Sequence, residues 1–522
     1  MTLVEDAFRT VVDQFKDPLA FLRELVQNSL DAGSTIIDVD VRIDGELITF
    51  EVQDSGEGMD RAIIEGKLLR MFASDKEGDA TKIGKFGIGF KSVFAVRPET
   101  VVVDTARGSE TWRVVIEPDG TWQLFSLDEP LEGTRIRVLK REPNAAQGPR
   151  WVADSLATVR RWCRYADAEI HFSGKSIREP FALDAPVMVR VPLPAPRDEI
   201  LVGLGSTEDA PWGFYNKGLT LLEGAGPFPG LPAWISFRVR CGALEHTLTR
   251  DNVIRNDAYE RVMAQIAEAA AGPLIEAALD ALESDAPKRG AIARALAAPA
   301  AAGGWSRPAA RSRRAALRDF RGRRVRIDEA LKARKKERAV RVASVSALAV
   351  AAERDERLVL WTPPLSGDDA LVDALLGVDL ALHETHVAVE PAGDKEQWQA
   401  APLTHATGEL LRELGLNLEV VVGRLDDPGG VLRDTPAVAA RDLSRPLARD
   451  SLLSFPEPSN RKIGTLALLL GAEPVTRALQ LATTDAWLAA FLLLRLLRAS
   501  DGDLDAERLA TAAWRRRTGA TP

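Results

Sequence analysis

The sequence predicts an α+β protein, and three patterns lead to that prediction. Residues 21–32 repeat apolar side chains at the spacing of one helix face. Residues 35–43 alternate apolar and charged side chains, which is typical of a strand with one buried face. Residues 257–283 form a long alanine-rich stretch that predicts a helix. Antiparallel strands covered by helices on one face would satisfy this order of elements.

The first predicted helix has a start signal and a stop signal. Asp17-Pro18 precedes it, and an aspartate can cap a helix whose first turn tolerates proline. Gly33 follows its last turn and is expected to end it. Asp44-Gly45 is a turn signal after the strand at 35–43, and residues 47–52 then predict a second strand.

The rest of the N-terminal region predicts two further helices and three strands. A short helix is expected near residues 62–72, followed by a polar run at 73–81 and a glycine-rich turn at 84–90 that leads into another helix. Strands are expected near residues 100–104, 111–116 and 134–139.

Composition divides the chain into four regions. An N-terminal α/β domain occupies residues 1–145, and a middle α/β domain with strands at 187–191 and 234–239 occupies 150–285. Residues 286–342 are expected to be a proline- and alanine-rich linker followed by a basic segment. Residues 343–522 predict a mainly helical C-terminal region, in which 418–422 is the clearest strand.

The composition favours a cytoplasmic protein that does not enter a membrane. Only two cysteines occur, Cys163 and Cys241, which fits a reducing compartment. The N-terminus lacks a basic region followed by an apolar core, so we expect no secretory signal. The longest late apolar run, residues 486–494, is too short to span a bilayer.

Charge is distributed unevenly along the chain. The net charge is −8, yet residues 307–341 hold fifteen Lys/Arg against four Asp/Glu. One interpretation is a nucleic-acid contact made by this basic segment. The other interpretation is a connector whose cations pair with acidic residues elsewhere in the chain.

Glu24 and Asn28 lie one helical turn apart on the first helix and point the same way. An amide oxygen at Asn28 can bind Mg²⁺ on nucleotide phosphates, and a carboxylate at Glu24 can take a proton from an attacking water. The alternative is that both side chains are ordinary solvent-facing or capping residues.

Two glycine-containing segments add to this pair. Asp54 ends the second strand and can accept a hydrogen bond from an exocyclic amine, while Gly56 and Gly58 allow a flat ring to approach the backbone. The glycines at 84, 87 and 89 precede a helix and can cradle phosphates with their amides. Thr134 can join a hydrogen-bond network at a strand start. Taken singly, these segments also fit a turn, a loop and a strand-forming threonine.

Taken in order, the segments resemble the four ATP-site motifs of the GHKL superfamily, which includes gyrase, the ninety-kilodalton heat-shock chaperones, histidine kinases and MutL. The motifs are RELVQNSLDA, DSGEGM, IGKFGIGFKSVF and EGT. The resemblance implies a Bergerat-type α/β sandwich in residues 1–145 that binds ATP and Mg²⁺. No histidine precedes His171, so autokinase chemistry is not expected.

The resemblance also implies roles for individual residues. Glu24 would be the general base, Asn28 the Mg²⁺ ligand and Asp54 the acceptor for the adenine amine, with Thr134 supporting Asp54. The implied nucleotide-binding set is Asn28, Asp54, Gly56, Gly58, Met59, Lys76, Gly84, Phe86, Gly87, Ile88, Gly89, Phe90 and Thr134. Residues 73–84 would form a mobile lid.

The middle domain carries a second resemblance. Residues 212–218 (WGFYNKG) and 248–254 (LTRDNVI) precede a long helix, as in the middle domain of the heat-shock chaperones. Arg250 would then reach the γ-phosphate, where a guanidinium neutralises developing charge. Residues 31–41 (DAGSTIIDVDV) look more like MutL and MORC, so the two branches stay open at this stage.

The expected function is an ATP-hydrolysing, chaperone-like clamp that acts on client proteins or another macromolecule and forms a homodimer through residues 472–498. The alternative is a MutL- or MORC-like clamp that acts on DNA or RNA through the basic segment 307–341. A third possibility is a nucleotide-binding regulator that hydrolyses ATP poorly. Turnover and its response to nucleic acid distinguish the three.

Overall fold

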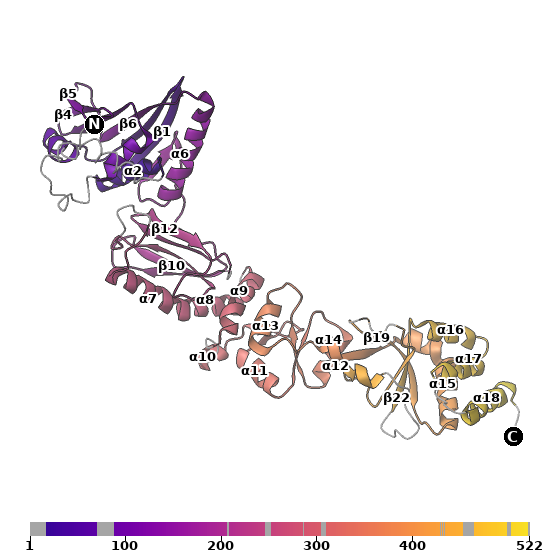
Figure 1. Ribbon diagram of the computed structural model, residues 1–522. Helices are drawn as coiled ribbons and strands as arrows, with labels where there is room; N and C mark the ends of the chain where they lie inside the picture. Colours follow the sequence, from indigo (N-terminus) through magenta and orange to yellow (C-terminus); the bar gives the residue numbers. More distant parts are fainter. Residues whose placement is uncertain are drawn as a thin grey trace. The chain divides into compact units, whose positions relative to one another are not determined.

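A computed structural model describes residues 17–69, 88–205, 208–245, 252–284, 287–303, 309–428, 430, 432, 434–452, 464–497 and 503–519. The chain divides into two compact units, residues 1–274 and residues 275–522 (Figure 1). The first unit contains an eight-stranded and a five-stranded sheet, and the second contains two two-stranded sheets and one five-stranded sheet together with several helices.

An eight-stranded sheet forms the N-terminal part of the first unit, in the order β5-β4-β3-β6-β2-β1-β7-β8. β1 and β7 pair in parallel, and the other neighbours pair antiparallel. The strands are β1 (Ile36–Asp44), β2 (Leu47–Asp54), β3 (Thr100–Arg107), β4 (Glu110–Ile116), β5 (Trp122–Ser126), β6 (Thr134–Arg141), β7 (Glu169–Phe172) and β8 (Lys175–Ser176).

Helices cover one face of this sheet. α2 packs against β2 and α6 against β1, and the two helices also contact each other (Figure 1). Alternate residues of the central strands, such as Val39, Phe50 and Val138, point into the core below these helices. The helices are α2 (Ala20–Asp31), α3 (Arg61–Ile63), the π-helical turn η1 (Ile64–Leu68), α5 (Ile88–Lys91), the 3₁₀ helices η3 (Ser92–Val96) and η4 (Ala145–Gln147), and α6 (Gly148–Cys163).

The predicted α+β class and the α/β sandwich are confirmed. All five strands expected in this region occur at the predicted positions, as β1, β2, β3, β4 and β6. The edge strand β5 was not predicted, because its side chains are mostly exposed and do not alternate. The short helix expected near residues 62–72 is described up to residue 69 as α3 and η1, and the lid expected at 73–84 lies outside the described residues.

The N-terminal domain continues beyond the predicted boundary at residues 145–150. α6 packs on α2, and β7 and β8 extend the same sheet as far as Ser176. The reason is long-range pairing: Ile36 to Val39 of β1 lie in register with Glu169 to Phe172 of β7. The middle domain therefore begins after this edge.

A second, five-stranded sheet follows in the order β12-β11-β13-β10-β9. Its strands are β9 (Met188–Pro192), β10 (Glu199–Leu204), β11 (Pro211–Asn216), β12 (Leu219–Ala225) and β13 (Ile235–Arg240). α7 (Asp257–Ala271) packs against β9, β10 and β13, along one face of the sheet (Figure 1).

The helix predicted over residues 257–283 is broken in two. α7 ends at Ala271, and α8 (Pro273–Glu283) begins after Gly272, because proline lacks an amide donor and disfavours a helical residue before it. In the described part of the chain, only this stretch is long and apolar enough to cross a membrane by length and composition. Tyr259, Val262 and Ile266 are buried, as expected for a core helix.

Residues 289–301 form a helix, α9 (Arg289–Ala301), where a linker was predicted. Its Ile292 and Leu296 are buried, and α9 packs against α13 (Asp368–Leu376). Alanine is the strongest helix former, so the alanine-rich stretch folds once its apolar side chains find a partner. The proline and glycine content suggested a linker because composition alone does not show that partner.

The basic segment is folded as well. It contains α10 (Ala309–Ser312), the strand pair β14 (Leu317–Arg318) and β15 (Arg324–Val325), and α11 (Ile327–Lys335). β16 (Ala339–Val342) then pairs in parallel with β17 (Leu358–Trp361), across α12 (Ala347–Arg354).

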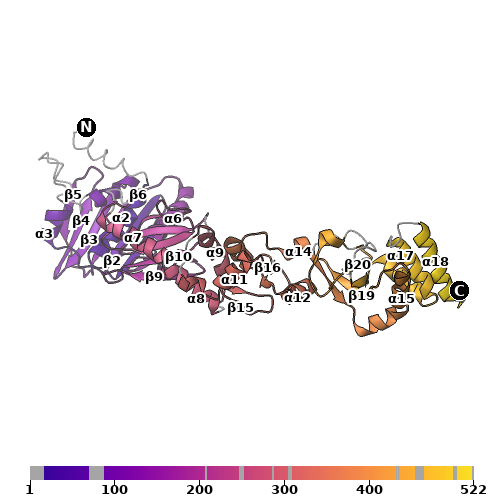
Figure 2. The ribbon, with the colours of Figure 1, turned by 90° about the horizontal axis from the view of Figure 1, so that it is seen from below.

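The C-terminal part of the chain contains a five-stranded sheet in the order β20-β22-β19-β18-β21. Two of its strands, β19 and β20, are labelled in Figure 2. The strand predicted at 418–422 lies in β19 (Glu419–Asp426), and helices make up most of the remaining regular structure. The other strands are β18 (His386–Pro391), β20 (Ala437–Ala440), β21 (Leu447–Ala448) and β22 (Thr465–Leu469). The helices are α14 (Leu382–Thr385), α15 (Asp394–Glu413), the 3₁₀ helix η5 (Arg449–Leu452), α16 (Glu473–Ala482), α17 (Ala486–Leu496) and α18 (Asp503–Thr518).

Candidate nucleotide site

Helix α2 carries the first part of the candidate site. The Asp17 carboxylate accepts a hydrogen bond from the Leu19 amide (2.9 Å), and the helix begins at Ala20. It ends where Gly33 takes a positive φ of 78° and donates its amide to the Leu30 carbonyl. Between these ends, Glu24 is buried, and Asn28 is exposed one turn further on.

Glu24 lies directly beside the backbone of Gly89 in α5. A Cβ added at Gly89 would be 2.5 Å from the Glu24 Oε2 atom, closer than side chains can approach without moving. The described end of the predicted glycine turn therefore packs on the acidic side chain of α2. Only glycine at this position leaves the Glu24 carboxylate where it is.

The Asp54 carboxylate joins three elements. Its Oδ2 accepts a hydrogen bond from the Ser29 hydroxyl of α2 (2.8 Å). Its Oδ1 accepts from the Gly56 amide (2.9 Å) and from the Thr134 amide at the start of β6 (3.2 Å). Asp54 is only 8% exposed, so these donors replace water around its charge.

Thr134 continues this network on the other side. The hydroxyls of Thr134 and Thr105 are 2.9 Å apart, and the Thr105 hydroxyl accepts a hydrogen bond from the Met59 amide (2.9 Å). The segment after Asp54 is thus held from two directions, since the Glu57 amide also donates to the Ala32 carbonyl (3.0 Å). The last turn of α2, β2, β3 and β6 meet around one polar cluster.

Two glycines in this cluster are required by the protein's own backbone. Gly58 has φ of 63°, and an added Cβ would lie 1.9 Å from the Ala106 carbonyl oxygen. Gly133 has φ of 68°, and an added Cβ would lie 2.0 Å from the Asp54 carbonyl oxygen. We predicted Gly58 as the residue beside a bound ring. The structure adds a packing reason for glycine there.

Sequence reasoning missed two participants, Ser29 and Thr105, and it named Gly133 in the EGT motif without predicting that the position requires glycine. Ser29 had a detectable signal, because it is a polar residue on the apolar face that runs through Leu22 and Val26. Thr105 had none, since it lies in an ordinary strand and meets Thr134 only when β3 pairs with β6.

Several predicted site residues have no described geometry. Lys76, Gly84, Phe86, Gly87 and Arg250 lie outside the described residues. Ile88 begins α5, and its side chain is likewise not described. Phe90 is described, and its side chain is buried in the N-terminal core.

The described residues suit a nucleotide-bound Mg²⁺ better than a protein-only metal cage. Among them, no group of three or more His, Cys, Asp or Glu side chains is placed to hold a metal. Mg²⁺ in nucleotide sites takes one or two protein oxygen ligands and completes its shell with phosphates and water. The exposed amide of Asn28, one turn from Glu24, meets that requirement.

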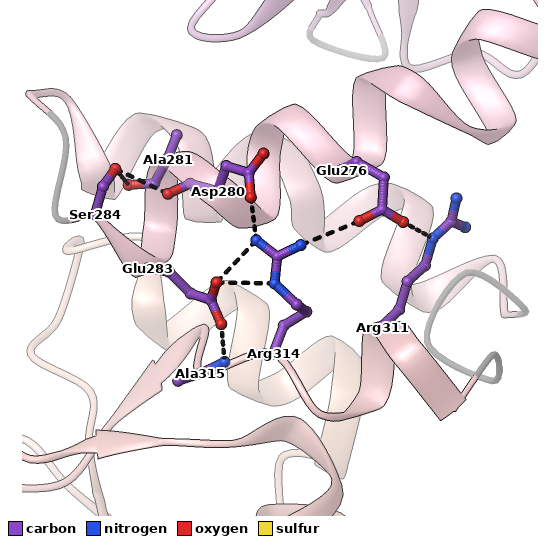
Figure 3. A network of polar contacts seen from close by, with 8 residues as sticks. All are labelled: Glu276, Asp280, Ala281, Glu283, Ser284, Arg311, Arg314 and Ala315. Carbon is purple, nitrogen blue, oxygen red and sulfur yellow. Dashed lines mark hydrogen bonds and ion pairs between the residues drawn. The ribbon is translucent and has the colours of Figure 1, made fainter.

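The basic segment pairs with acidic side chains of its own unit. Arg314 contacts three carboxylates of α8, those of Glu276, Asp280 and Glu283 (Figure 3). Arg311 donates to Glu276 (2.6 Å) in the same network. This arrangement agrees with the interpretation of the segment as a connector that pairs with acidic residues elsewhere in the chain.

Further ion pairs follow along the segment, with carboxylates both outside and inside it. The pairs with residues outside the segment are Arg321–Glu353, Arg334–Asp379, Arg338–Glu356 and Arg341–Asp373. The pairs within it are Arg323–Asp319, Arg323–Glu329, Arg326–Asp328 and Lys332–Asp328. A cation that already holds a carboxylate must give it up to bind a phosphate, which weakens the case for a nucleic-acid surface here.

The sandwich of one sheet and one helical layer, with the Glu24–Asn28 helix beside the Asp54 cluster, is the arrangement expected of a GHKL-type ATP-binding domain. Residues 19–129 match the family model described as "Histidine kinase-, DNA gyrase B-, and HSP90-like ATPase". The N-terminal domain thus belongs to the GHKL ATPase superfamily.

Curated relatives place the domain in one branch of that superfamily. The chaperone protein HtpG of Chlorobium phaeovibrioides is 28% identical over 200 residues, which cover 32% of this chain and 32% of the relative. HtpG of Helicobacter hepaticus is 27% identical over 164 residues, which cover 26% of each chain. The match spans about a third or less of these relatives' length. The domain is of the HtpG-like branch.

Proposed function

We propose that this protein is an Mg²⁺-dependent ATPase whose hydrolysis drives a chaperone-like clamp. The observation that supports this most strongly is the Asp54 carboxylate, buried and held by Ser29, Gly56 and Thr134 beside the helix of Glu24 and Asn28. A buried carboxylate held in one orientation is suited to accept the adenine amine, whose donor would complete its hydrogen bonding.

Glu24 would act as the general base. It would accept a proton from the water that attacks the γ-phosphate, and the lack of a side chain at Gly89 leaves room for its carboxylate. Asn28 would hold Mg²⁺, which neutralises charge on the phosphates. The amides of Gly84, Gly87 and Gly89 would contact the phosphates, and Lys76 would be a further phosphate contact.

The clamp part of the proposal concerns the middle domain. Arg250 would approach the γ-phosphate and stabilise the charge that develops there. Closure of residues 73–84 over the pocket would exclude bulk water, keep the attacking water beside Glu24 and commit the nucleotide to hydrolysis. Client proteins are proposed as partners because the relatives are chaperones by name.

A cytoplasmic homodimer completes the proposal. Cys163 and Cys241 are both free and buried, as expected in a reducing compartment. Burial also raises the pKa of the Cys163 thiol to about 12, so it stays protonated and unreactive. Light scattering of the purified chain tests the dimer directly, and a monomer at micromolar concentration would contradict it.

Replacing Glu24 with Ala tests the catalytic assignment. We expect ATP binding to be kept and turnover to fall by about 10²–10⁴-fold, the usual effect of losing a positioned base. Turnover is measured by phosphate release and binding by calorimetry. Glu57→Ala is the matched control, because Glu57 is an exposed carboxylate near the same cluster. Equal turnover in wild type and Glu24→Ala would remove Glu24 from the mechanism.

The same assay separates the clamp from its nucleic-acid alternative. ATP turnover is measured alone, with an unfolded protein and with DNA. Stimulation by the unfolded protein supports the chaperone-like proposal. Stimulation by DNA, with an affinity that falls log-linearly with salt, would instead favour the alternative.

A further inference from the structure

The tip of the β11–β12 hairpin contacts the end of the nucleotide-binding helix. Asn216 and Leu219 pair across a two-residue turn in which Lys217 has φ of 48° and Gly218 has φ of 78°. Two positive φ values define a type I′ turn, which suits the twist of a hairpin. A lysine at positive φ is uncommon, so we looked for a contact of the Lys217 side chain that the turn alone does not require.

The Lys217 side chain makes such a contact. Its Nζ atom is 2.8 Å from Oδ1 of Asp31, the last residue of α2. Asp31 follows Asn28 by three residues and Glu24 by seven, on one continuous helix. The middle domain thus contacts the helix of the proposed base and metal ligand by a direct ion pair.

The remainder of the tip is fixed to the N-terminal domain. An added Cβ at Gly218 would lie 1.9 Å from the Tyr165 carbonyl oxygen, so the turn packs tightly on the backbone after α6. Leu219 is part of the N-terminal hydrophobic core. The Thr220 hydroxyl donates to the Arg161 carbonyl (2.9 Å).

On the α2 side the packing is looser. A cavity of about 180 Å³ lies between Gln27, Leu30 and Asp31 of α2 and the hairpin residues Asn216 and Lys217. Both residues of the ion pair line this cavity, and so does Leu219. The ion pair is therefore a contact with the last turn of α2 that is separate from the close approach of Gly218 to Tyr165.

Asn216 connects the tip to a second segment. Its side-chain amide donates to the carbonyls of Gly242 (3.2 Å) and Leu244 (3.1 Å). The Ile254 amide donates to the Glu245 carbonyl (2.8 Å), and these two residues flank residues 246–251 in sequence. Those residues include Arg250 and are outside the described part of the chain.

We propose that Lys217 is a positioning residue for ATP turnover. By holding Asp31 it fixes the position of α2, and with it Asn28 and Glu24, relative to the middle domain. This inference rests on the proposed ATPase function. Lys217 touches neither nucleotide nor metal in this scheme. Its effect should appear in turnover, which needs accurate placement of the base, more than in nucleotide affinity.

A charge swap in the full-length protein tests the proposal. Lys217→Ala should lower kcat about two- to five-fold, the range that a half-exposed ion pair supplies. Lys217→Asp should lower it further, because two carboxylates then face each other. Asp31→Lys combined with Lys217→Asp should restore kcat, since aspartate tolerates positive φ. The nucleotide Kd should stay within about two-fold of wild type in all variants.

Arg150→Ala is the matched control, because Arg150 forms an exposed ion pair with Asp154 on α6 (3.4 Å). It should leave kcat unchanged. The proposal is overturned if Lys217→Ala and Lys217→Asp turn over like wild type, or if the swap restores nothing.

A second measurement keeps this test separate from the proposed function. If the wild-type chain hydrolyses no ATP, the ATPase proposal fails, and hydrogen exchange without nucleotide decides the contact. The amides of Ala32 and Gly33, bonded to the end of α2, should exchange about two- to five-fold faster in Lys217→Ala. Unchanged exchange would show that Lys217 does not hold this helix.

Discussion

Asp54 organises the candidate site because its two carboxylate oxygens bond to donors from α2, from its own loop and from β6. The three donors are one serine hydroxyl and two backbone amides. The site therefore depends on backbone placement as much as on side chains, and its glycines are part of that placement.

Gly58→Ala tests this dependence. The added methyl group would meet the Ala106 carbonyl at 1.9 Å, and the positive φ adds strain. We expect the free energy of unfolding to fall by about 2–5 kcal/mol, the sum of about 1–3 for overpacking and about 1–2 for the positive φ. Gly45→Ala is the control, since Gly45 also has positive φ (58°) but no neighbour within 4 Å, and it should lose only about 1–2 kcal/mol. Equal losses in denaturant titrations would show that the close approach is absent.

The identities of Glu24, Asn28, Asp54 and Thr134 could be predicted from motif order, because each motif is local in sequence. Ser29 and Thr105 could not be assigned, because their partners Asp54 and Thr134 lie 25 and 29 residues away in sequence. Such pairs arise only when the sheet register brings the strands together. The roles of all these residues toward nucleotide remain predictions.

At the scale of elements, those that local periodicity specifies could be predicted, and those that depend on pairing with a distant segment could not. α2 and the five N-terminal strands follow from spacing within the segment. β7 was missed because its partner β1 lies about 130 residues earlier, as Ile37 pairs with Ile170. The break between α7 and α8 follows from Gly272-Pro273, a signal that the alanine-rich periodicity obscured.

The charge of the basic segment could likewise not be interpreted from sequence alone. Fifteen cations in 35 residues suggested a phosphate-binding surface. In the folded segment, Arg311 and Arg314 pair with carboxylates of α8, Arg321 with one of α12 and Arg341 with one of α13. Sequence position does not reveal those partners. The folded segment is therefore better described as an ion-paired part of the second unit.

Arg314→Ala tests that description. Arg314 is 22% exposed and contacts Glu276, Asp280 and Glu283, so its loss leaves three carboxylates without this cation. We expect the second unit to lose about 1–3 kcal/mol of unfolding free energy, or roughly 3–10 °C in Tm. Arg313→Ala, at an exposed neighbouring arginine, should change Tm by little.

The contrary outcome is specific. If Arg314→Ala and Arg313→Ala both leave Tm unchanged and both weaken DNA binding with a smaller salt slope, the segment contacts phosphate instead of α8.

At the scale of the molecule, the two compact units have separate hydrophobic cores. The family match at residues 19–129 lies wholly within the first unit. The first unit holds the Asp54 cluster, the Lys217–Asp31 contact and the segment that contains Arg250. The proposed nucleotide chemistry thus concerns the first unit, and the proposed dimer contact at residues 472–498 lies in the second.

Titration calorimetry of the full chain with ATP and Mg²⁺ tests the nucleotide site most directly. Wild type should bind one ATP per chain, and Asp54→Asn should bind about 10- to 100-fold more weakly, since its amide presents a donor where adenine needs an acceptor. Glu57→Gln, an exposed neighbour, should bind like wild type. Absence of binding heat in wild type, or equal affinity in Asp54→Asn, would contradict a purine seated on Asp54.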